Sequence, residues 1–274
     1  MIITQKQMDE IHSIQLSIFK NVINVCNQLD LTYFMVHGSL LGTVMQGKFI
    51  PLDDDIDIAM PRKDYERFLQ EGPKLIDSRY FIQSDKSEKI YPMEFAKVRD
   101  NNTTYVVENI RHININHGIY IDIFPIDYSL ESKWSKLKYK ILNYRISCIY
   151  KTPSLTIFSK AKRLILRILL PSLKCAISRR NALIKSGSKG DSVHMTGGKG
   201  SELSMPATWF SDVKNMTFEG LTVCVPTEYD KYLSHIYGNY KNRTLVEDKA
   251  VGENCVKINA CTLDIEKPFT NYLK

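Results

Sequence analysis

The sequence lacks the cysteine patterns that bind zinc or build a disulfide framework. Its six cysteines are scattered over 274 residues, with no Cys-x-x-Cys pair and no histidine at zinc-ligand spacing. We therefore expect reduced thiols in a cytoplasmic protein. Long apolar runs are also missing, since no stretch approaches the roughly 18 uninterrupted apolar residues that a membrane span requires.

The N-terminal segment does not have the apolar core of an export signal. Apolar side chains recur there at steps of three and four residues, at Ile11, Ile14, Ile18, Val22, Val25 and Leu29. This spacing predicts an amphipathic helix within residues 1–30. Thr4 and Gln7 have the spacing of a capping box, so we expect the helix to begin beside them.

Acidic residues are missing from a long internal segment. Residues 132–190 contain fifteen lysines and arginines and no aspartate or glutamate, although the whole chain has a net charge of only +7. The positive charge is therefore local, and it predicts that this segment meets an anionic surface. A nucleic acid would be attracted to it too, but no nucleic-acid-binding module accompanies it, so we expect no nucleic acid partner.

Carboxylates are concentrated nearer the N-terminus, in the run Asp53-Asp54-Asp55-Ile56-Asp57-Ile58. From Asp55 onward acidic and apolar residues alternate, which predicts a strand with Asp55 and Asp57 on one face, about 7 Å apart at their Cα atoms. Two carboxylates this close repel each other, and a hard divalent cation is the usual compensation. The alternatives are a solvated acidic turn or a calcium loop, neither of which needs apolar residues at every second position.

A third acid, Asp122, lies in the middle of the apolar run at residues 118–124. Burying an unpaired carboxylate costs several kcal/mol. Asp122 therefore needs a partner, either a metal ion shared with Asp55 and Asp57 or a proton accepted from a substrate hydroxyl. The alternative is an aspartate on the wet face of an edge strand.

A possible phosphate-binding turn precedes the acidic run. The strand-like residues 31–36 lead through Gly38-Ser39 into a helix-like segment. The backbone N–H groups and the hydroxyl at such a turn suit a phosphate, although many Gly-Ser turns only cap a helix.

Together these motifs resemble the signature of the nucleotidyltransferase superfamily and, more narrowly, of the LicD family. The resemblance is carried by His37-Gly38-Ser39-Leu40-Leu41-Gly42, by residues 49–62 around the acidic run, and by Ile121-Asp122-Ile123-Phe124-Pro125-Ile126-Asp127. Residues 206–240 are similar to the family's C-terminal region. The chain departs from the family at Leu52, where tryptophan is usual, and at residues 241–244, which replace a proline-containing tail.

The resemblance implies an α+β fold, with a nucleotidyltransferase-like mixed sheet flanked by helices, a basic helical insertion and a C-terminal helical region. We expect a catalytic core over residues 1–128, the insertion over 129–200 and the remainder of the catalytic domain over 201–274. Members of the family transfer phosphorylcholine, or related phosphoryl groups, onto bacterial surface glycans. The resemblance thus implies a phosphotransferase with a CDP-alcohol donor and a glycan or lipid-linked glycan acceptor.

The same resemblance, read with the carboxylate pattern, assigns roles to individual residues. Asp55, Asp57 and Asp122 are expected to be the catalytic residues and the ligands of Mg²⁺ or Mn²⁺, with Asp122 also the candidate general base. Binding of the donor's phosphates is predicted for Gly38, Ser39, Lys48, Arg62, Lys97 and Arg99.

The basic insertion is predicted to lie on an anionic membrane surface. Residues 161–170 combine lysine and arginine with apolar bulk, as in a helix at a membrane interface. This places the protein in the cytoplasm, peripheral at the inner face of the plasma membrane; a solvated basic helix packed on the domain is the alternative. Two other functions stay open: a nucleotidyltransferase acting on a small molecule, and an inactive membrane- or glycan-binding protein.

Overall fold

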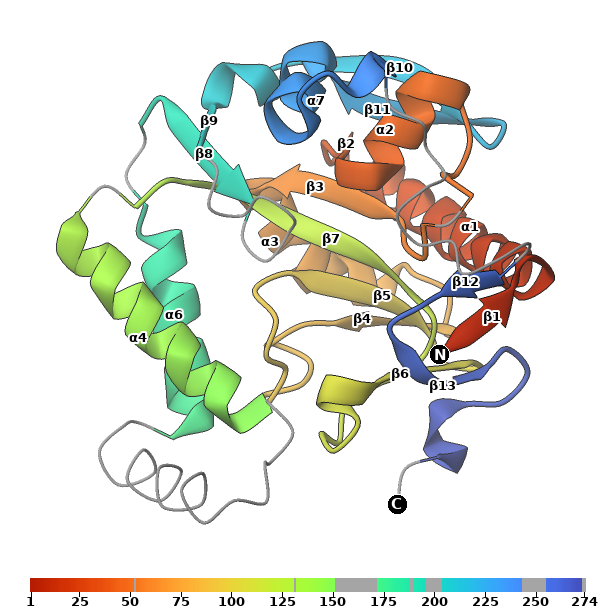
Figure 1. Ribbon diagram of the computed structural model, residues 1–274. Helices are drawn as coiled ribbons and strands as arrows, with labels where there is room; N and C mark the ends of the chain where they lie inside the picture. Colours follow the sequence, from red (N-terminus) through yellow and green to blue (C-terminus); the bar gives the residue numbers. More distant parts are fainter. Residues whose placement is uncertain are drawn as a thin grey trace.

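The computed structural model describes residues 1–51, 53–130, 132–150, 172–187, 190–195, 204–242 and 255–272. A mixed β-sheet forms its centre, with the strand order β2-β3-β7-β5-β4 (Figure 1). These strands are β2 (Phe34–Met35), β3 (Asp57–Pro61), β7 (Tyr120–Tyr128), β5 (Ala96–Asp100) and β4 (Tyr80–Gln83). β8 (Ser192–Met195) pairs with the end of β7, and β9 (Met205–Pro206) pairs with β8.

The direction of the strands makes the sheet mixed. β3 and β7 pair in parallel, whereas the β2–β3, β7–β5 and β5–β4 pairs are antiparallel. β7 contains three isoleucines and β3 contains one, and Ile58, Ile121 and Ile123 are completely buried. The mixed sheet with flanking helices confirms the predicted α+β fold.

Three helices flank the central strands. α1 (Gln5–Gln28) contacts β5 and β7, α2 (His37–Gln46) contacts β3, and α3 (Arg62–Glu71) contacts β3 and β7. The capping box predicted at Thr4 and Gln7 is confirmed. The predicted apolar face of α1 is confirmed too, because Ile11, Ile18 and Val22 are completely buried.

The C-terminal residues pack back on the core. A hairpin of β10 (Val213–Phe218) and β11 (Leu221–Pro226) is followed by α7 (Tyr229–Tyr237). Further along, β12 (Cys255–Lys257) pairs with β1 (Ile2–Thr4), and β13 (Ala260–Asp264) pairs with β6 (Thr104–Val107). Short 3-10 turns complete the described chain: η1 (Gly72–Lys74), η2 (Glu108–Ile110), η3 (Ala207–Phe210), η4 (Tyr240–Asn242) and η5 (Phe269–Asn271).

Two helices of the basic segment lie side by side at one end of the sheet, at the left of Figure 1. They are α4 (Lys133–Tyr150) and α6 (Leu173–Lys185). A second apolar cluster, which includes Ile146 and Ile177, joins them to the loops around Tyr91 and Ile113. Residues 161–170, for which an interfacial helix was predicted, lie outside the described residues. Among the helices of the described ranges, none has a stretch long and apolar enough to cross a bilayer.

Candidate active site

The pairing of three adjacent strands places two acids and a lysine in one row. Asp57 of β3 is the register partner of Asp122 of β7, which in turn is the register partner of Lys97 of β5. Residues paired in this way point to the same face of a sheet. All three are buried, and the Lys97 ammonium forms an ion pair with Asp122 Oδ1.

Asp55 completes a cluster of carboxylates. Ligand oxygens of Asp55, Asp57 and Asp122 all lie within 4.8 Å of one another. We had expected the strand to begin at Asp55, but β3 begins at Asp57. Asp55 therefore belongs to the loop that leads into β3. The ladder nevertheless continues into this loop, because Asp122 N–H donates to the carbonyl of Ile56 at 2.8 Å.

The acidic loop is held by side chains that sequence reasoning did not identify. Gln15 of α1 donates to the carbonyl of Asp54 at 2.7 Å and to that of Tyr120 at 3.2 Å. Tyr105 donates its hydroxyl to the Asp54 carboxylate at 2.5 Å. Asp54 is therefore engaged in hydrogen bonds within the protein, and these bonds connect the acidic loop to both α1 and β6.

The Gly38-Ser39 turn lies beside Asp57, at the start of α2. The Ser39 hydroxyl accepts the N–H of Asp57 at 2.9 Å, which leaves its own proton available to donate. A Cβ at Gly38 would come within 2.1 Å of Asp53 Oδ2, so only glycine allows the Asp53 carboxylate to lie this close to the backbone. The closeness of Asp53 to this turn was not predicted from the sequence, although Asp53 belongs to the acidic run.

The C-terminal part of the chain supports the same turn. His37 has a φ of +49° and is buried. The hydroxyl of Tyr232, on α7, lies 3.2 Å from His37 Nδ1 and accepts the His37 backbone N–H at 3.3 Å. His37 also packs edge-on against Phe124 of β7. It thus fixes the beginning of α2 against the sheet.

Lys97 sits in an aromatic as well as an acidic environment. Its ammonium lies 3.4 Å from the centre of the Tyr120 ring and 5.2 Å from that of Phe95. Burial lowers the pKa of Lys97, while Asp122 opposes that shift. The side chain is therefore held in place by cation–π contact and by charge together.

The cluster carries more negative charge than Lys97 can balance. Burial raises the pKa of Asp57 well above its usual value, and repulsion from Asp55 and Asp122 raises it further. Burial also raises the pKa of Asp122, although the ion pair with Lys97 opposes this. Three converging carboxylates with one ammonium form an oxygen-rich site that fits a hard divalent cation such as Mg²⁺ or Mn²⁺.

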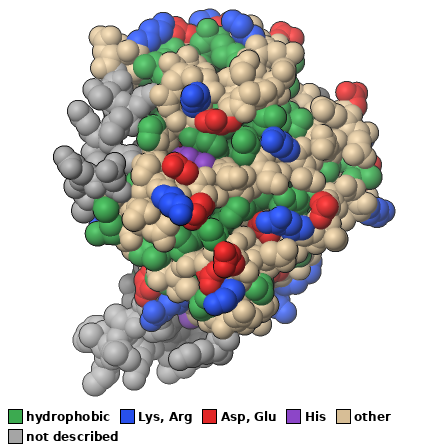
Figure 2. Space-filling model, turned by 90° about the vertical axis from the view of Figure 1, so that its right-hand side faces the viewer, with side chains coloured by type: hydrophobic (Ala, Val, Ile, Leu, Met, Phe, Trp, Pro, Cys, Tyr) green, Lys and Arg blue, Asp and Glu red, His purple; other side chains and the backbone are tan. Residues whose placement is uncertain are grey.

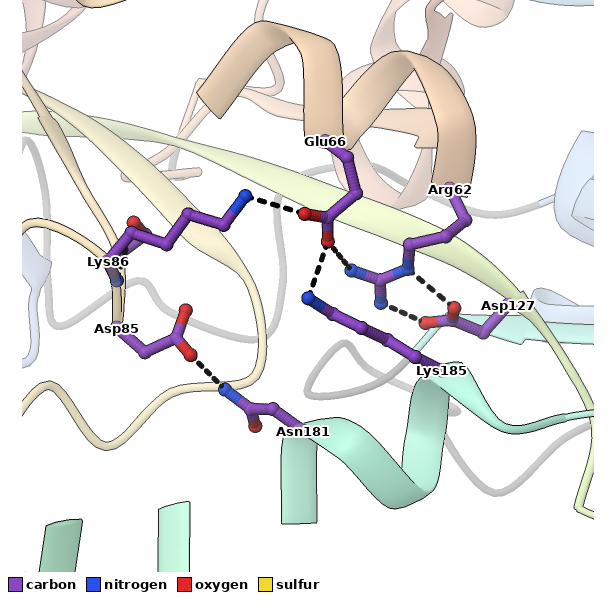
Figure 3. Close-up of polar contacts among 8 residues, drawn as sticks. Arg62, Glu66, Asp85, Lys86, Asp127, Asn181 and Lys185 are labelled. Carbon is purple, nitrogen blue, oxygen red and sulfur yellow. Dashed lines mark hydrogen bonds and ion pairs between the residues drawn. The ribbon is translucent and has the colours of Figure 1, made fainter. Parts of the chain in front are cut away.

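Two of the predicted phosphate-binding residues have other partners. Arg62 donates through Nε to Asp127 at 2.7 Å and through Nη1 to Glu66 at 3.1 Å (Figure 3). Asp127 lies five residues beyond Asp122 on β7, which corresponds to about 16 Å of strand. Arg62 thus lies with these partners at the other end of β7 from Asp122, which does not support the prediction that it binds the donor beside the acids.

Arg99 and Lys48 were also predicted to bind the donor's phosphates, and the structure places them in different surroundings. Arg99 is 1% exposed and donates to Gln83 at 2.5 Å and to the Gly118 carbonyl at 2.6 Å, so it is used within the sheet. Its predicted contact with a phosphate is not supported by these bonds. Lys48 is exposed in the loop between α2 and β3, and its role stays a prediction.

The carboxylate cluster and the adjoining Gly-Ser turn lie in a part of the chain that is similar to a known nucleotidyltransferase domain. Residues 30–152 match the family model of the LicD/FKTN/FKRP nucleotidyltransferase domain. This span contains α2, β3 and β7 with all three clustered acids. Over these residues the chain is similar to the LicD family, which confirms the resemblance that the sequence motifs indicated.

The similarity to a curated relative extends over most of the chain. The lipopolysaccharide cholinephosphotransferase LicD of Haemophilus influenzae (strain ATCC 51907 / DSM 11121 / KW20 / Rd) is 25% identical over 240 residues. The alignment covers 82% of this chain and 88% of the relative. It therefore includes parts of the chain beyond the matched domain.

Proposed function

We propose that this protein is a Mg²⁺-dependent phosphotransferase. In this proposal it moves phosphorylcholine, or a related phospho-alcohol, from a CDP-alcohol donor to a hydroxyl of a bacterial cell-surface glycan precursor. The family and the relative support a transferase, and the relative is by name a lipopolysaccharide cholinephosphotransferase. The observation that carries the proposal is the convergence of Asp55, Asp57 and Asp122 within 4.8 Å, beside the Gly-Ser turn of α2.

The residues divide the work of the reaction. Asp55 and Asp57 would hold the metal ion, with Asp122 as a third ligand or as a base. When bound, Mg²⁺ would neutralise charge on the donor's diphosphate. Ser39 keeps a hydroxyl proton to donate to a phosphate oxygen, because its lone pair already accepts the Asp57 N–H.

In the proposed transfer step, Asp122 acts as the base. The acceptor hydroxyl gives its proton to Asp122 while its oxygen forms a bond to the phosphorus that carries the alcohol. The bond from that phosphorus to the oxygen of CMP breaks, and CMP leaves. Lys97 pairs with one carboxylate oxygen of Asp122, and in this proposal the other oxygen would accept the proton.

A product analysis tests the proposal. The protein is incubated with Mg²⁺, a glycan acceptor and CDP-choline, CDP-glycerol or CDP-ribitol, and the products are identified by mass spectrometry. We expect CMP together with a glycan that has gained the phospho-alcohol. Asp57→Asn should remove this product, whereas Asp191→Asn, which changes an exposed carboxylate, should not.

The same assay separates the main alternative. The matched domain is described as a nucleotidyltransferase domain, and such an enzyme would transfer the nucleotide itself. Pyrophosphate release from a nucleoside triphosphate, with the nucleotide attached to a small molecule, would favour that reaction. Absence of any product from the folded protein with both sets of substrates would support the inactive binding protein instead.

A further inference from the structure

Helix α4 presents an apolar stripe to solvent. Its exposed large apolar side chains are Trp134 (73% exposed), Leu137 (46%), Ile141 (47%) and Tyr144 (46%). At 100° per residue these four positions lie within a sector of about 80° on one side of the helix. The opposite side faces the protein, since Ile146 is 4% exposed and Tyr139 donates to Glu94 at 2.9 Å. The stripe is therefore a surface that α4 does not need for packing on the core.

Lysines flank this stripe on both sides. Lys133, Lys136 and Lys140 fall on one side of it and Lys138 on the other, and all four are exposed. Residues 132–190 contain no acidic side chain, so this charge has no acidic neighbour within the segment. In contrast, acidic and basic side chains are interspersed over the face of the molecule that Figure 2 shows. The α4 surface combines apolar bulk with charge of a single sign.

We propose that this surface, which we call the α4 face, binds the protein to a membrane that contains anionic lipid. Apolar side chains between lysines match the interface of such a membrane, where the stripe enters the acyl boundary and the ammonium groups reach the headgroups. Trp134 and Tyr144 stand at the two ends of the stripe, and these residue types favour the interfacial region. A second copy of the chain fits this face less well, because two α4 faces would bring their lysines together.

The α4 face is separate from the candidate active site. β7 extends six residues beyond Asp122, about 20 Å of strand, before the chain reaches α4. The α4 helix is nevertheless fixed to the core, because Glu94 binds both Tyr139 of α4 and Arg180 of α6. A membrane bound to α4 would thus hold the sheet at a set position above the lipid. Membrane binding by the α4 face would not depend on which reaction the active site performs.

Tryptophan fluorescence provides a direct test. The chain has two tryptophans, so Trp209→Phe leaves Trp134 as the reporter on the α4 face. The full chain with this change is titrated with vesicles of phosphatidylcholine containing about one third phosphatidylglycerol, at low salt and without donor or acceptor. We expect a blue shift of the emission and cosedimentation with the vesicles, both reversed as salt is raised.

Two pairs of substitutions locate the contact. Trp134→Ala with Ile141→Ala keeps the helix propensity of α4, and we expect vesicle partitioning to fall about tenfold or more. Lys136→Gln with Lys140→Gln should weaken binding and reduce its dependence on salt. The control, Leu75→Ala with Val213→Thr, changes apolar side chains that are 40% and 48% exposed elsewhere, and it should bind vesicles like the wild type.

Four results would overturn the proposal. The first would be a failure of the wild-type protein to bind anionic vesicles at low salt. The second would be binding of the double alanine variant as strong as that of the wild type. Equal partitioning onto pure phosphatidylcholine would remove the role of the lysines. A blue shift that grows with protein concentration in the absence of vesicles would show that a second copy covers the α4 face. Because no substrate is present, none of these results depends on the proposed transfer reaction.

Discussion

Strand β7 carries a buried aspartate toward each end, and the surroundings of the two differ in their balance of charge. At Asp122, three carboxylates converge and Lys97 supplies one positive charge. At Asp127, the carboxylates of Asp127 and Glu66 face Arg62, Lys86 and Lys185, as Figure 3 shows. The second cluster is neutralised by the chain itself, whereas the first is the site for which we propose a divalent cation.

This difference in charge balance suggests a structural role for the ion pairs of Asp127 and a functional role for the cluster around Asp122. Asp122 and Asp127 are five residues apart on one strand, so they point to opposite faces of the sheet. The Asp127 cluster joins α3 to the β4–β5 loop and to α6, and it should contribute to stability. The Asp122 cluster places repelling groups together, which is expected at sites selected for chemistry rather than for stability.

The largest effect should come from Asp57→Asn. The change keeps the shape of the side chain and removes one charge from the metal site, so turnover should fall on the order of 10²-fold or more. Stability without divalent cations should not fall, because a carboxylate repelled by Asp55 and Asp122 is lost. Turnover at limiting Mg²⁺ and thermal unfolding in a chelator measure the two effects. Near-normal turnover of the folded variant would disprove the metal assignment.

A second pair of variants separates the base from the ligands. If Asp122 mainly accepts the hydroxyl proton, Asp122→Asn should lose turnover but retain donor and metal binding. Asp55→Asn should weaken both binding reactions, because it removes a ligand without touching Lys97. Calorimetric titration with Mg²⁺ and donor compares them. Equal loss of binding in the two variants would make Asp122 a third ligand.

The sequence allowed the three acids to be identified before the structure was known. Alternation at residues 55–58 and a lone aspartate in an apolar strand are local patterns, and local patterns survive folding. The Gly-Ser turn and the start of α1 were predicted on the same basis. The ion pair of Lys97 with Asp122 was not, because it depends on the register between strands that are 25 residues apart.

Arg62 shows where closeness in sequence misleads. It lies five residues from Asp57, which suggested a shared phosphate site, but the intervening strand carries it to the other end of the sheet. Contacts such as that of Tyr232 with His37, 195 residues apart, have no local signal at all. Secondary structure and candidate acids could be predicted here, whereas the partners of each charged group required the tertiary fold.

A smaller effect, on stability alone, is expected from Arg62→Met. It leaves Asp127, which is 3% exposed, without its strongest partner, and removal of one member of a buried pair is strongly destabilising. Because Arg62 itself is 23% exposed, we expect a loss of about 2–3 kcal/mol in the free energy of unfolding. Turnover of the folded variant should stay close to that of the wild type.

The matched control for this variant is Arg67→Met. Arg67 pairs with Glu71 on the same helix, but both side chains are at least 40% exposed, so its loss should be below about 1 kcal/mol. Urea unfolding and steady-state turnover are measured for both variants. A large loss of turnover in Arg62→Met with little change in stability would return Arg62 to the donor site.

The smallest effect should appear as a dependence of stability on pH. Burial tends to raise the pKa of Glu66, but hydrogen bonds from Lys185 and Lys86 outweigh it and lower the pKa from 4.5 to about 2. A carboxyl with a lower pKa in the folded state adds stability above pH 4.5, and this contribution is lost as the pH falls toward 2. Allowing for partial exposure of the group, the contribution is about 1–2 kcal/mol.

Glu66→Gln removes this contribution and so tests its origin. The difference in unfolding free energy between wild type and variant should be largest near pH 6 and should shrink as the pH approaches 3. Glu71→Gln, on the same helix but in an exposed pair, is the control. Urea unfolding at several pH values measures each difference. The plots of unfolding free energy against pH for the wild type and Glu66→Gln could instead stay parallel through this range. The three cations would then not stabilise the ionised form of Glu66. In that case the contrast in charge balance between the two ends of β7 would be lost.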